Sequence, residues 1–309
     1  MTNKTGQPTH EAHQLFLQDI QRNIHRILSK NYKMKKISIE YIAAGAARLS
    51  NPIKITGLNE KGEKIRYFGK VIGSNDILSV RYIQFLKNIY LQMNTQQQIF
   101  EMYDTVEDMV RDQYETMQVI YKSGIPAIKP YGYHQINDSQ WLLVAEFIDV
   151  KPFSMLEKVD PKQIDLVFNY LKKAHHKNIF HGDIKPDNIL VGDKIYILDA
   201  GHFRKDAPIA KKISYDLACM ISSFLECQPV EEIVKIAQKY YPRRYIQAAA
   251  DYIELIQMRP DIHFTDETKQ QLLRLLKGKQ RGKFRKKTSR WNTLHFIAKI
   301  YDICHSMNI

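Results

Sequence analysis

The chain has 309 residues, of which 44% are hydrophobic and 26% charged, and its formal net charge is +13. This balance is typical of a globular protein and excludes a largely disordered chain. The absence of any run of about 18 apolar residues excludes a membrane-spanning helix of the usual kind. Because the residues from Met1 to Gly6 contain no apolar signal core, and the three cysteines form no Cys-x-x-Cys pair, we expect a cytoplasmic protein with free thiols.

The first predicted element is a helix over residues 11–30. Its apolar residues Leu17, Ile20, Ile24 and Ile27 recur at helical spacing, which is typical of a helix that covers part of a core. We assign residues 1–35 to an N-terminal helical extension.

Residues 36–150 form a unit rich in strand patterns. Its apolar and polar residues alternate in short runs that are separated by turn residues. Five strands are predicted, at 37–42, 52–58, 64–72, 131–135 and 141–147. One long helical stretch at 96–122, ended by Gly124-Ile125-Pro126, lies among them. We therefore expect a small antiparallel sheet with one main helix.

Residues 151–309 are mostly helical in pattern. Two short strand-like runs, at 188–191 and 194–198, interrupt this unit. Helices are predicted at 215–227, 229–240, 244–257, 266–277 and 291–306. The expected fold class is thus α+β, with a sheet-rich lobe followed by a mostly helical one.

The chemistry of the chain is concentrated in the polar segment from His181 to Asn188. A predicted hairpin follows this segment, and its last strand ends on Asp199. Phosphoryl transfer from a nucleotide needs oxygen ligands for Mg²⁺, a carboxylate that orients the attacking hydroxyl and a cation that balances charge. Asp183, Lys185, Asn188 and Asp199 supply these groups. The competing interpretation is a polar loop in which Asp183 and Asn188 only satisfy backbone amides.

The pattern His181-Gly182-Asp183-x-x-x-x-Asn188, followed by Asp199-Ala200-Gly201, resembles the catalytic loop and metal-binding triplet of the protein-kinase-like superfamily. The resemblance implies a two-lobed kinase-like fold that uses ATP and Mg²⁺. It makes Asp183 the catalytic base and Lys185 a γ-phosphate lysine, with Asn188 and Asp199 as metal ligands. It also implies that His181 and Asp216 support the catalytic loop.

The segment Leu142 to Ile148 resembles the fifth strand and interlobe hinge of kinases. In that resemblance the Glu146 carbonyl and the Ile148 amide bond to adenine, and Ala145 occupies the gatekeeper position. Leu190, on the strand after the catalytic loop, would form part of the adenine floor.

The remaining ATP-binding residues are expected in the first lobe. Lys70, in Tyr67 to Ile72, resembles the third-strand lysine that holds the α- and β-phosphates, with Lys54 as the other candidate. Glu115 on the long helix would be its partner acid, with Glu107 as the alternative. The phosphate-covering loop would be residues 43–50, where Gly45 is the one glycine in place of the usual three.

Two departures point to a compact, atypical branch of the superfamily, similar to RIO-type and lipopolysaccharide kinases. Only 17 positions separate Asp199 from Asp216, and no Ala-Pro-Glu motif occurs, so no long activation loop is expected. The His-Gly-Asp sequence lacks the arginine of His-Arg-Asp, which normally contacts a phosphorylated loop. However, Lys185 and Pro186 are typical of serine/threonine kinases.

The acceptor therefore stays open at this point. The first hypothesis is an atypical serine/threonine protein kinase, and the second is a kinase of a small molecule such as a sugar, lipid or aminoglycoside. A third is a nucleotide-binding scaffold associated with RNA. It rests on eight basic residues without an acid between Lys277 and Arg290, a segment that attracts polyanions.

Overall fold

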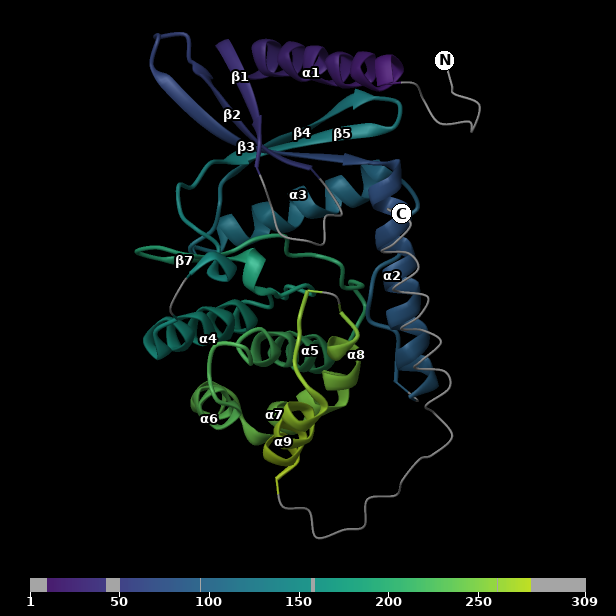
Figure 1. The fold of residues 1–309 in the computed structure, drawn as a ribbon, viewed down its shortest axis with the longest axis vertical. Helices are drawn as coiled ribbons and strands as arrows, with labels where there is room; N and C mark the ends of the chain where they lie inside the picture. The colour runs from purple at the N-terminus through teal and green to yellow at the C-terminus, as the bar shows by residue number, and fades with distance from the viewer. Residues whose placement is uncertain (1–9, 43–50, 95, 157–158, 260, 279–309) are drawn as a thin grey trace.

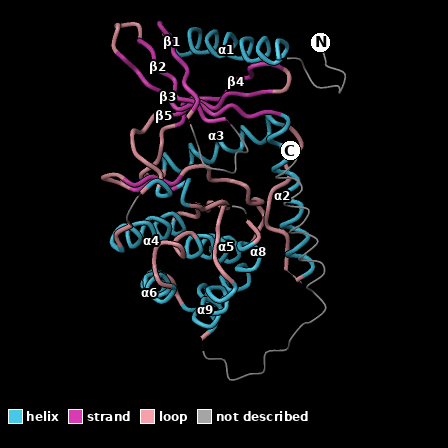
Figure 2. Tube along the Cα trace, in the orientation of Figure 1, coloured by secondary structure: helices cyan, strands magenta, loops and turns pink. Residues whose placement is uncertain are grey.

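The structure, a computed structural model, describes residues 10–42, 51–94, 96–156, 159–259 and 261–278, with side chains from residue 18 onward. Strands gather in one half of the molecule and most helices in the other (Figure 2). The predicted α+β class, a small antiparallel sheet followed by a mostly helical part, is confirmed. No described helix is long and apolar enough to cross a membrane.

The first lobe is built on a five-stranded antiparallel sheet with the order β1-β2-β3-β5-β4. Alternation explains these strands, because every second residue of β2 is buried, as the pleat of a half-buried strand requires. The strands are β1 (Lys35–Tyr41), β2 (Asn51–Leu58), β3 (Lys64–Gly73), β4 (Pro130–Asn137) and β5 (Gln140–Glu146).

Helix α1 (His10–Tyr32) covers the outer face of this sheet (Figure 1). Its apolar residues at helical spacing, Ile20 and Ile24, are buried against Ile53 and Ile55 of β2. Each fully buried isoleucine side chain contributes roughly 1.5–3 kcal/mol, so the predicted helix is held by packing.

Helix α3 (Val106–Lys122) lies against the opposite face, between the sheet and the second lobe (Figure 1). The helical stretch predicted from residue 96 begins only at Val106, because the Thr105 side chain accepts a hydrogen bond from the Asp108 amide and caps the helix there. The preceding residues 96–105 form no helix, and Phe100 forms a bridge with Phe203 of the second lobe.

A second long helix, α2 (Ser74–Met93), was not anticipated from the sequence. It follows β3 directly, and the carboxylate of Asp76 accepts a hydrogen bond from the Gly73 amide at its start. Its first turns pack in the sheet lobe through Ile77, whereas Leu91 near its end is fully buried in the core of the helical lobe. Figure 1 shows α2 running from one lobe to the other along the side of the molecule.

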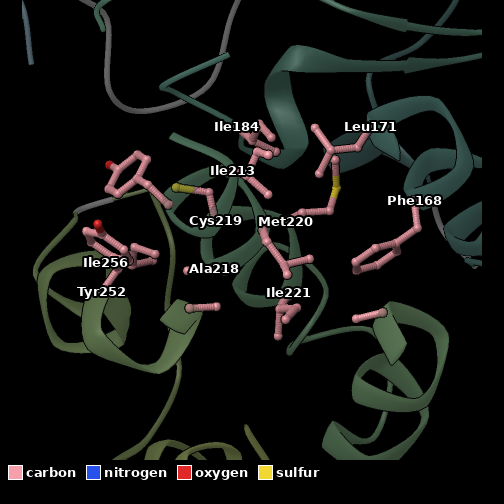
Figure 3. Close-up of a cluster of buried hydrophobic side chains, with 14 of the residues drawn as sticks. Phe168, Leu171, Ile184, Ile213, Ala218, Cys219, Met220, Ile221, Tyr252 and Ile256 are labelled. Carbon is pink, nitrogen blue, oxygen red and sulfur yellow. The ribbon is translucent and has the colours of Figure 1, made fainter. Parts of the chain in front are cut away.

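The second lobe packs around α5, whose residues from Lys212 to Ser222 are all buried. Ile184, next to Asp183, points into the same apolar cluster as Leu171 of α4 and Ile213 of α5 (Figure 3). Its helices are α4 (Pro161–His176), α5 (Ile209–Ser222), α6 (Val230–Tyr240), α7 (Arg243–Ala249), α8 (Ile253–Gln257) and α9 (Asp266–Lys277). Its shorter elements are η1 (Phe153–Met155), η2 (Pro186–Asn188), η3 (Ala250–Tyr252), β6 (Ile189–Val191) and β7 (Ile195–Ile197).

Candidate active site

The loop that carries Asp183 is held from below by Asp216 of α5. The Asp216 carboxylate, which has no exposed surface, accepts hydrogen bonds from the backbone amides of His181 and Gly182, both at 2.7 Å. It also lies 3.2 Å from His175 Nε2 of α4. Hydrogen bonds to a buried carboxylate are strong and directional, so Asp216 fixes the position of the loop backbone relative to α5.

His181 fixes the loop from the other side. Its Nδ1 accepts a hydrogen bond from the Asp183 amide at 3.1 Å, which leaves Nε2 as the donor to the Leu198 carbonyl at 2.5 Å. Burial lowers the pKa of His181, in keeping with a neutral ring that accepts at one nitrogen and donates at the other. The loop is thereby tied to the strand that leads to Asp199.

Gly182 explains why the motif is His-Gly-Asp in this chain. Its φ is +81°, a conformation that residues with a Cβ rarely adopt. A Cβ at this position would lie 2.5 Å from the carbonyl oxygen of Gly201. The close approach of the two backbones therefore leaves no room for a side chain at position 182.

Asn188 and Asp199 stand at the same end of the β6–β7 hairpin. The Leu198 amide donates to the Asn188 carbonyl at 2.7 Å, one step beyond the last ladder pair. The side-chain nitrogen of Asn188 donates to the Asp183 carbonyl at 3.0 Å, so its side-chain oxygen is the atom available to a cation. One amide oxygen and one carboxylate, completed by phosphate oxygens, form the hard donor set that Mg²⁺ prefers.

Lys70 reaches this point from β3. Its ammonium lies 2.8 Å from Asp199 Oδ1, and only 8% of the residue is exposed. The Lys70 charge contributes to holding the pKa of Asp199 below its usual range, against the effect of burial. Lys54, the other candidate, lies instead 3.8 Å from Glu40 on β1 and over the ring of Phe147.

The structure does not pair Glu115 with Lys70. Glu115 is exposed on α3, where it lines a small cavity together with Asp112 and other acids, and the ammonium of Lys70 is bound to Asp199 instead. Glu107 pairs with Arg111 on its own helix. The physical reason is the rotation of α3, whose apolar residues Met109 and Val110 pack in the core of the sheet lobe and set which side chains can turn toward the cleft.

An acid other than Glu115, Asp76, interacts electrostatically with Lys70. Asp76, at the start of α2, has its pKa raised to about 6 by burial, while the Gly73 amide and the Lys70 charge act in the opposite direction. The site thus contains an acid that the sequence pattern did not indicate.

The predicted adenine-side residues do meet. Ala145 of β5 and Leu190 of β6 are buried in one apolar cluster, against which Ile148 and Phe68 pack. Glu146 ends β5 beside them, and its carboxylate accepts from the Lys129 amide at 3.2 Å. Sheet and hairpin together therefore form an apolar wall next to the catalytic loop.

The carboxylate of Asp183 is bound by two cations. Arg259, between α8 and α9, lies 2.9 Å from Asp183 Oδ1, and Lys185 lies 3.8 Å from Oδ2. Asp261 holds the guanidinium of Arg259 in a two-pronged pair at 2.9 Å on both arms and lies 3.2 Å from Lys185. Two acids and two bases thus form a closed, charge-balanced group around the predicted catalytic base.

These charges decide the protonation state of Asp183. Burial alone would raise its pKa, but Arg259 and then Lys185 outweigh this effect and hold the pKa well below the usual range. Asp183 is therefore a carboxylate at any ordinary pH, suited to accept a hydrogen bond from a hydroxyl.

Sequence reasoning missed Arg259, Asp261 and Lys87. Arg-Pro-Asp at 259–261 is too short a motif to select from one sequence. Lys87 could have been found from the sequence, since it occupies a position in the helical stripe of α2 that is otherwise mostly apolar. A lysine at such a position is either a functional group or a strong cost to folding.

Three predicted features lie outside the described residues. The phosphate-covering loop with Gly45 falls in 43–50, most of the basic segment falls in 279–290, and the last predicted helix falls in 291–306. Lys277, the first residue of that segment, ends α9. The RNA hypothesis therefore stays a prediction.

No protein-family model and no curated protein sequence matches the chain. Among solved structures, the chain is similar to the kinase PK-1 of the Cydia pomonella granulovirus, with 14% sequence identity and a TM-score of 0.43. The match covers 83% of this chain and 92% of the viral chain. The two-lobed, protein-kinase-like fold is assigned here from the order of the elements and the position of the site between a sheet lobe and a helical lobe.

Proposed function

We propose that the protein is an ATP- and Mg²⁺-dependent phosphotransferase that transfers the γ-phosphate to an alcohol. The observation that supports it is the meeting of Asp183, Asn188 and the Lys70–Asp199 pair beside one apolar wall. A scaffold without chemistry has no need for an ionised carboxylate placed in this way. In-line transfer needs these groups held in place before the substrates arrive.

Each residue has one task in this proposal. Asp183 accepts the proton of the acceptor hydroxyl, and Lys185 balances the charge that develops on the transferred phosphoryl group. Asn188 and Asp199 hold Mg²⁺, which would screen the phosphate oxygens. Lys70 holds the inner phosphates of the nucleotide.

Two acceptor classes are compatible with these residues. A serine or threonine of a protein is the first candidate, because Lys185 stands beside Asp183 as in serine/threonine kinases. A small molecule is the second, because the short segment after Asp199 is fixed against residues 99–101 by hydrogen bonds from Arg204 to Ile99 and from Glu101 to His202. That pairing leaves little backbone free to bind a peptide.

Turnover of labelled ATP by purified protein tests the proposal. Asp183→Asn is expected to lower Mg²⁺-dependent turnover at least about 100-fold, the usual loss for an acid–base residue. Asp199→Asn is expected to lower it as well, because a charged oxygen ligand of Mg²⁺ is lost. Asp193→Asn is the matched control, since Asp193 is an exposed aspartate in the turn of the neighbouring hairpin. Turnover of Asp183→Asn comparable to that of Asp193→Asn would remove the proposed role.

The same assay separates the acceptors. Label that appears on an added protein supports the first class. ADP release only in the presence of a hydroxyl compound of low mass supports the second.

A further inference from the structure

Lys87 has no role in the phosphoryl transfer proposed above. It lies on α2, and only 7% of the residue is exposed. Within the described part of the chain its ammonium makes no hydrogen bond and no ion pair. It lies over two aromatic rings, 4.9 Å from the centroid of Phe100 and 5.9 Å from that of Tyr215. A mostly buried ammonium normally has an oxygen partner because desolvation is costly, and in the described residues this one has two aromatic rings in place of a protein oxygen.

Lys87 belongs to the surroundings of the catalytic base. Burial and then the charge of Arg259 lower its pKa to about 8, whereas Asp183 and Asp261 act in the opposite direction. The ring beneath it, Phe100, stacks on Phe203, which in turn lies against the loop at Gly182. These contacts join Lys87 to the Asp183 side of the cleft.

Two polar atoms in this part of the fold are fully buried without a hydrogen-bond partner in the described part of the chain, Gln84 Oε1 and His202 Nδ1. The Tyr215 hydroxyl is buried as well, and its neighbour is the side chain of Cys219. Gln84 lies one turn before Lys87 on the same stripe of α2. His202 is buried, which lowers its pKa to about 4, and the charges of Asp183 and Lys87 act on this pKa in opposite directions. Buried polar groups are almost always bonded, so a group of unpartnered ones needs a specific explanation.

The ion pairs around Asp183 do not include Lys87. Arg259 and Lys185 are both paired with Asp183 and Asp261, which uses two cations and two anions. Lys87 is the surplus cation. One anionic group would compensate it.

We propose that Lys87, with the Tyr215 hydroxyl and the His202 imidazole, forms an anion site beside Asp183, and that the acceptor carries a phosphate or carboxylate close to its reacting hydroxyl. This inference rests on the proposed function and adds the chemical class of the acceptor. The nucleotide is the less suitable occupant, because its phosphates already have Lys70, which is paired with Asp199.

The test uses the full chain saturated with Mg·ADP, so that the nucleotide site is filled. Glycerol 3-phosphate and inorganic phosphate are titrated against it by calorimetry, with glycerol as the neutral counterpart. Both phosphates are expected to bind, and glycerol is not. Lys87→Met is expected to weaken phosphate binding at least about tenfold, as loss of a buried charge partner does, whereas Lys87→Arg is expected to retain part of it. Lys239→Met is the matched control, because Lys239 also lies over a ring, that of Tyr240, but on the exposed surface of α6.

A peptide arm identifies the source of the anion. A serine peptide with a neighbouring phosphoserine is compared with the same peptide without phosphate. Tighter binding of the phosphorylated peptide than of glycerol 3-phosphate places the anion on a protein acceptor. The reverse order places it on a small molecule.

Three results would overturn the anion site. The first is that the wild type binds neither glycerol 3-phosphate nor inorganic phosphate, and the second is that Lys87→Met binds them as tightly as the wild type does. The third is that phosphate competes with Mg·ADP and does not bind together with it. If Lys87→Met does not fold, Lys87→Gln decides, since loss of the charge at a polar side chain must likewise weaken phosphate binding in the presence of Mg·ADP. Failure of Mg·ADP itself to bind would remove the proposed function instead, and the two failures are therefore distinguishable.

Discussion

The carboxylate of Asp183 depends on a guanidinium from a distant part of the chain. Arg259 is buried, and its charge is shared between Asp261 and Asp183. An arginine that makes a bidentate pair has a fixed plane. At the scale of the residue, Arg259 therefore sets which oxygen of Asp183 faces the acceptor, and it acts as a positioning residue.

Arg259→Gln is expected to lower the free energy of unfolding by roughly 3–5 kcal/mol, because it leaves buried carboxylates unpaired. Denaturant titration measures this loss. Arg204→Gln is the matched control, since Arg204 makes the same two-pronged Arg-x-Asp pair with Asp206 on the exposed surface, where little change is expected. Arg259→Lys should fold better than Arg259→Gln. If Arg259 positions Asp183, Arg259→Lys should lower kcat by a larger factor than it changes the KM for ATP. An unchanged kcat in this variant would contradict the positioning role.

Gly182 gives a second prediction at this scale. Gly182→Ala is expected to cost about 1–3 kcal/mol in stability and to displace the catalytic loop, since the new methyl group meets the Gly201 carbonyl. Gly62→Ala separates the two causes, because Gly62 has the same φ of +81° but no atom lies within 4 Å of the place that its new methyl group would take. Thermal unfolding and ATP turnover are measured for both. Equal effects on turnover would show that the close contact is not important.

At the scale of the element, α2 is the unusual feature of the molecule. It starts in the sheet lobe, passes the catalytic loop and ends in the helical core, where the Tyr90 hydroxyl bonds to Glu254 at 3.0 Å. One helix thus brings the charge of Lys87 close enough to act on the pKa of Asp183, and it also connects the two lobes. We infer that the position of α2 along its own axis affects the geometry of the site more than the residues on its exposed surface do.

Leu91→Ala tests the docking of α2. Leu91 is fully buried, and truncation of a buried leucine to alanine costs about 2–5 kcal/mol. Leu78→Ala on the same helix is the control, since 56% of Leu78 is exposed. Denaturation of both variants by urea measures the difference. Similar losses for the two would mean that the end of α2 is not held in the helical core.

At the scale of the whole molecule, the bridging helix predicts that the lobes unfold together. In a Trp291→Phe background, the fluorescence of Trp141 reports on the sheet, and circular dichroism reports on the helices of both lobes. The two denaturation curves are expected to coincide, as in a cooperative transition. Leu91→Ala is expected to separate them. Separate transitions in the parent protein would contradict the coupling.

The sequence was sufficient for features that depend on short distances along the chain. Alternation predicted the first strand, and strand-like runs on either side of turn residues predicted the other four. Helical spacing predicted α1, α6 and α9 within a few residues. The pattern did not predict α2, because the polar residues Gln84, Lys87 and Asn88 interrupt its apolar stripe. These interruptions are the residues that face the site and the segment beyond it.

Local sequence by itself placed Asp183, Asn188 and Asp199 together, because a loop and a hairpin of fixed geometry separate them. Only the tertiary structure decided which cations surround Asp183. Arg259 and Lys87 come from helices and loops far from it in sequence, brought there by packing of the two lobes around α2 and α5. Burial then removes water from these charges, so that their pairing, or the lack of a partner at Lys87, becomes energetically decisive.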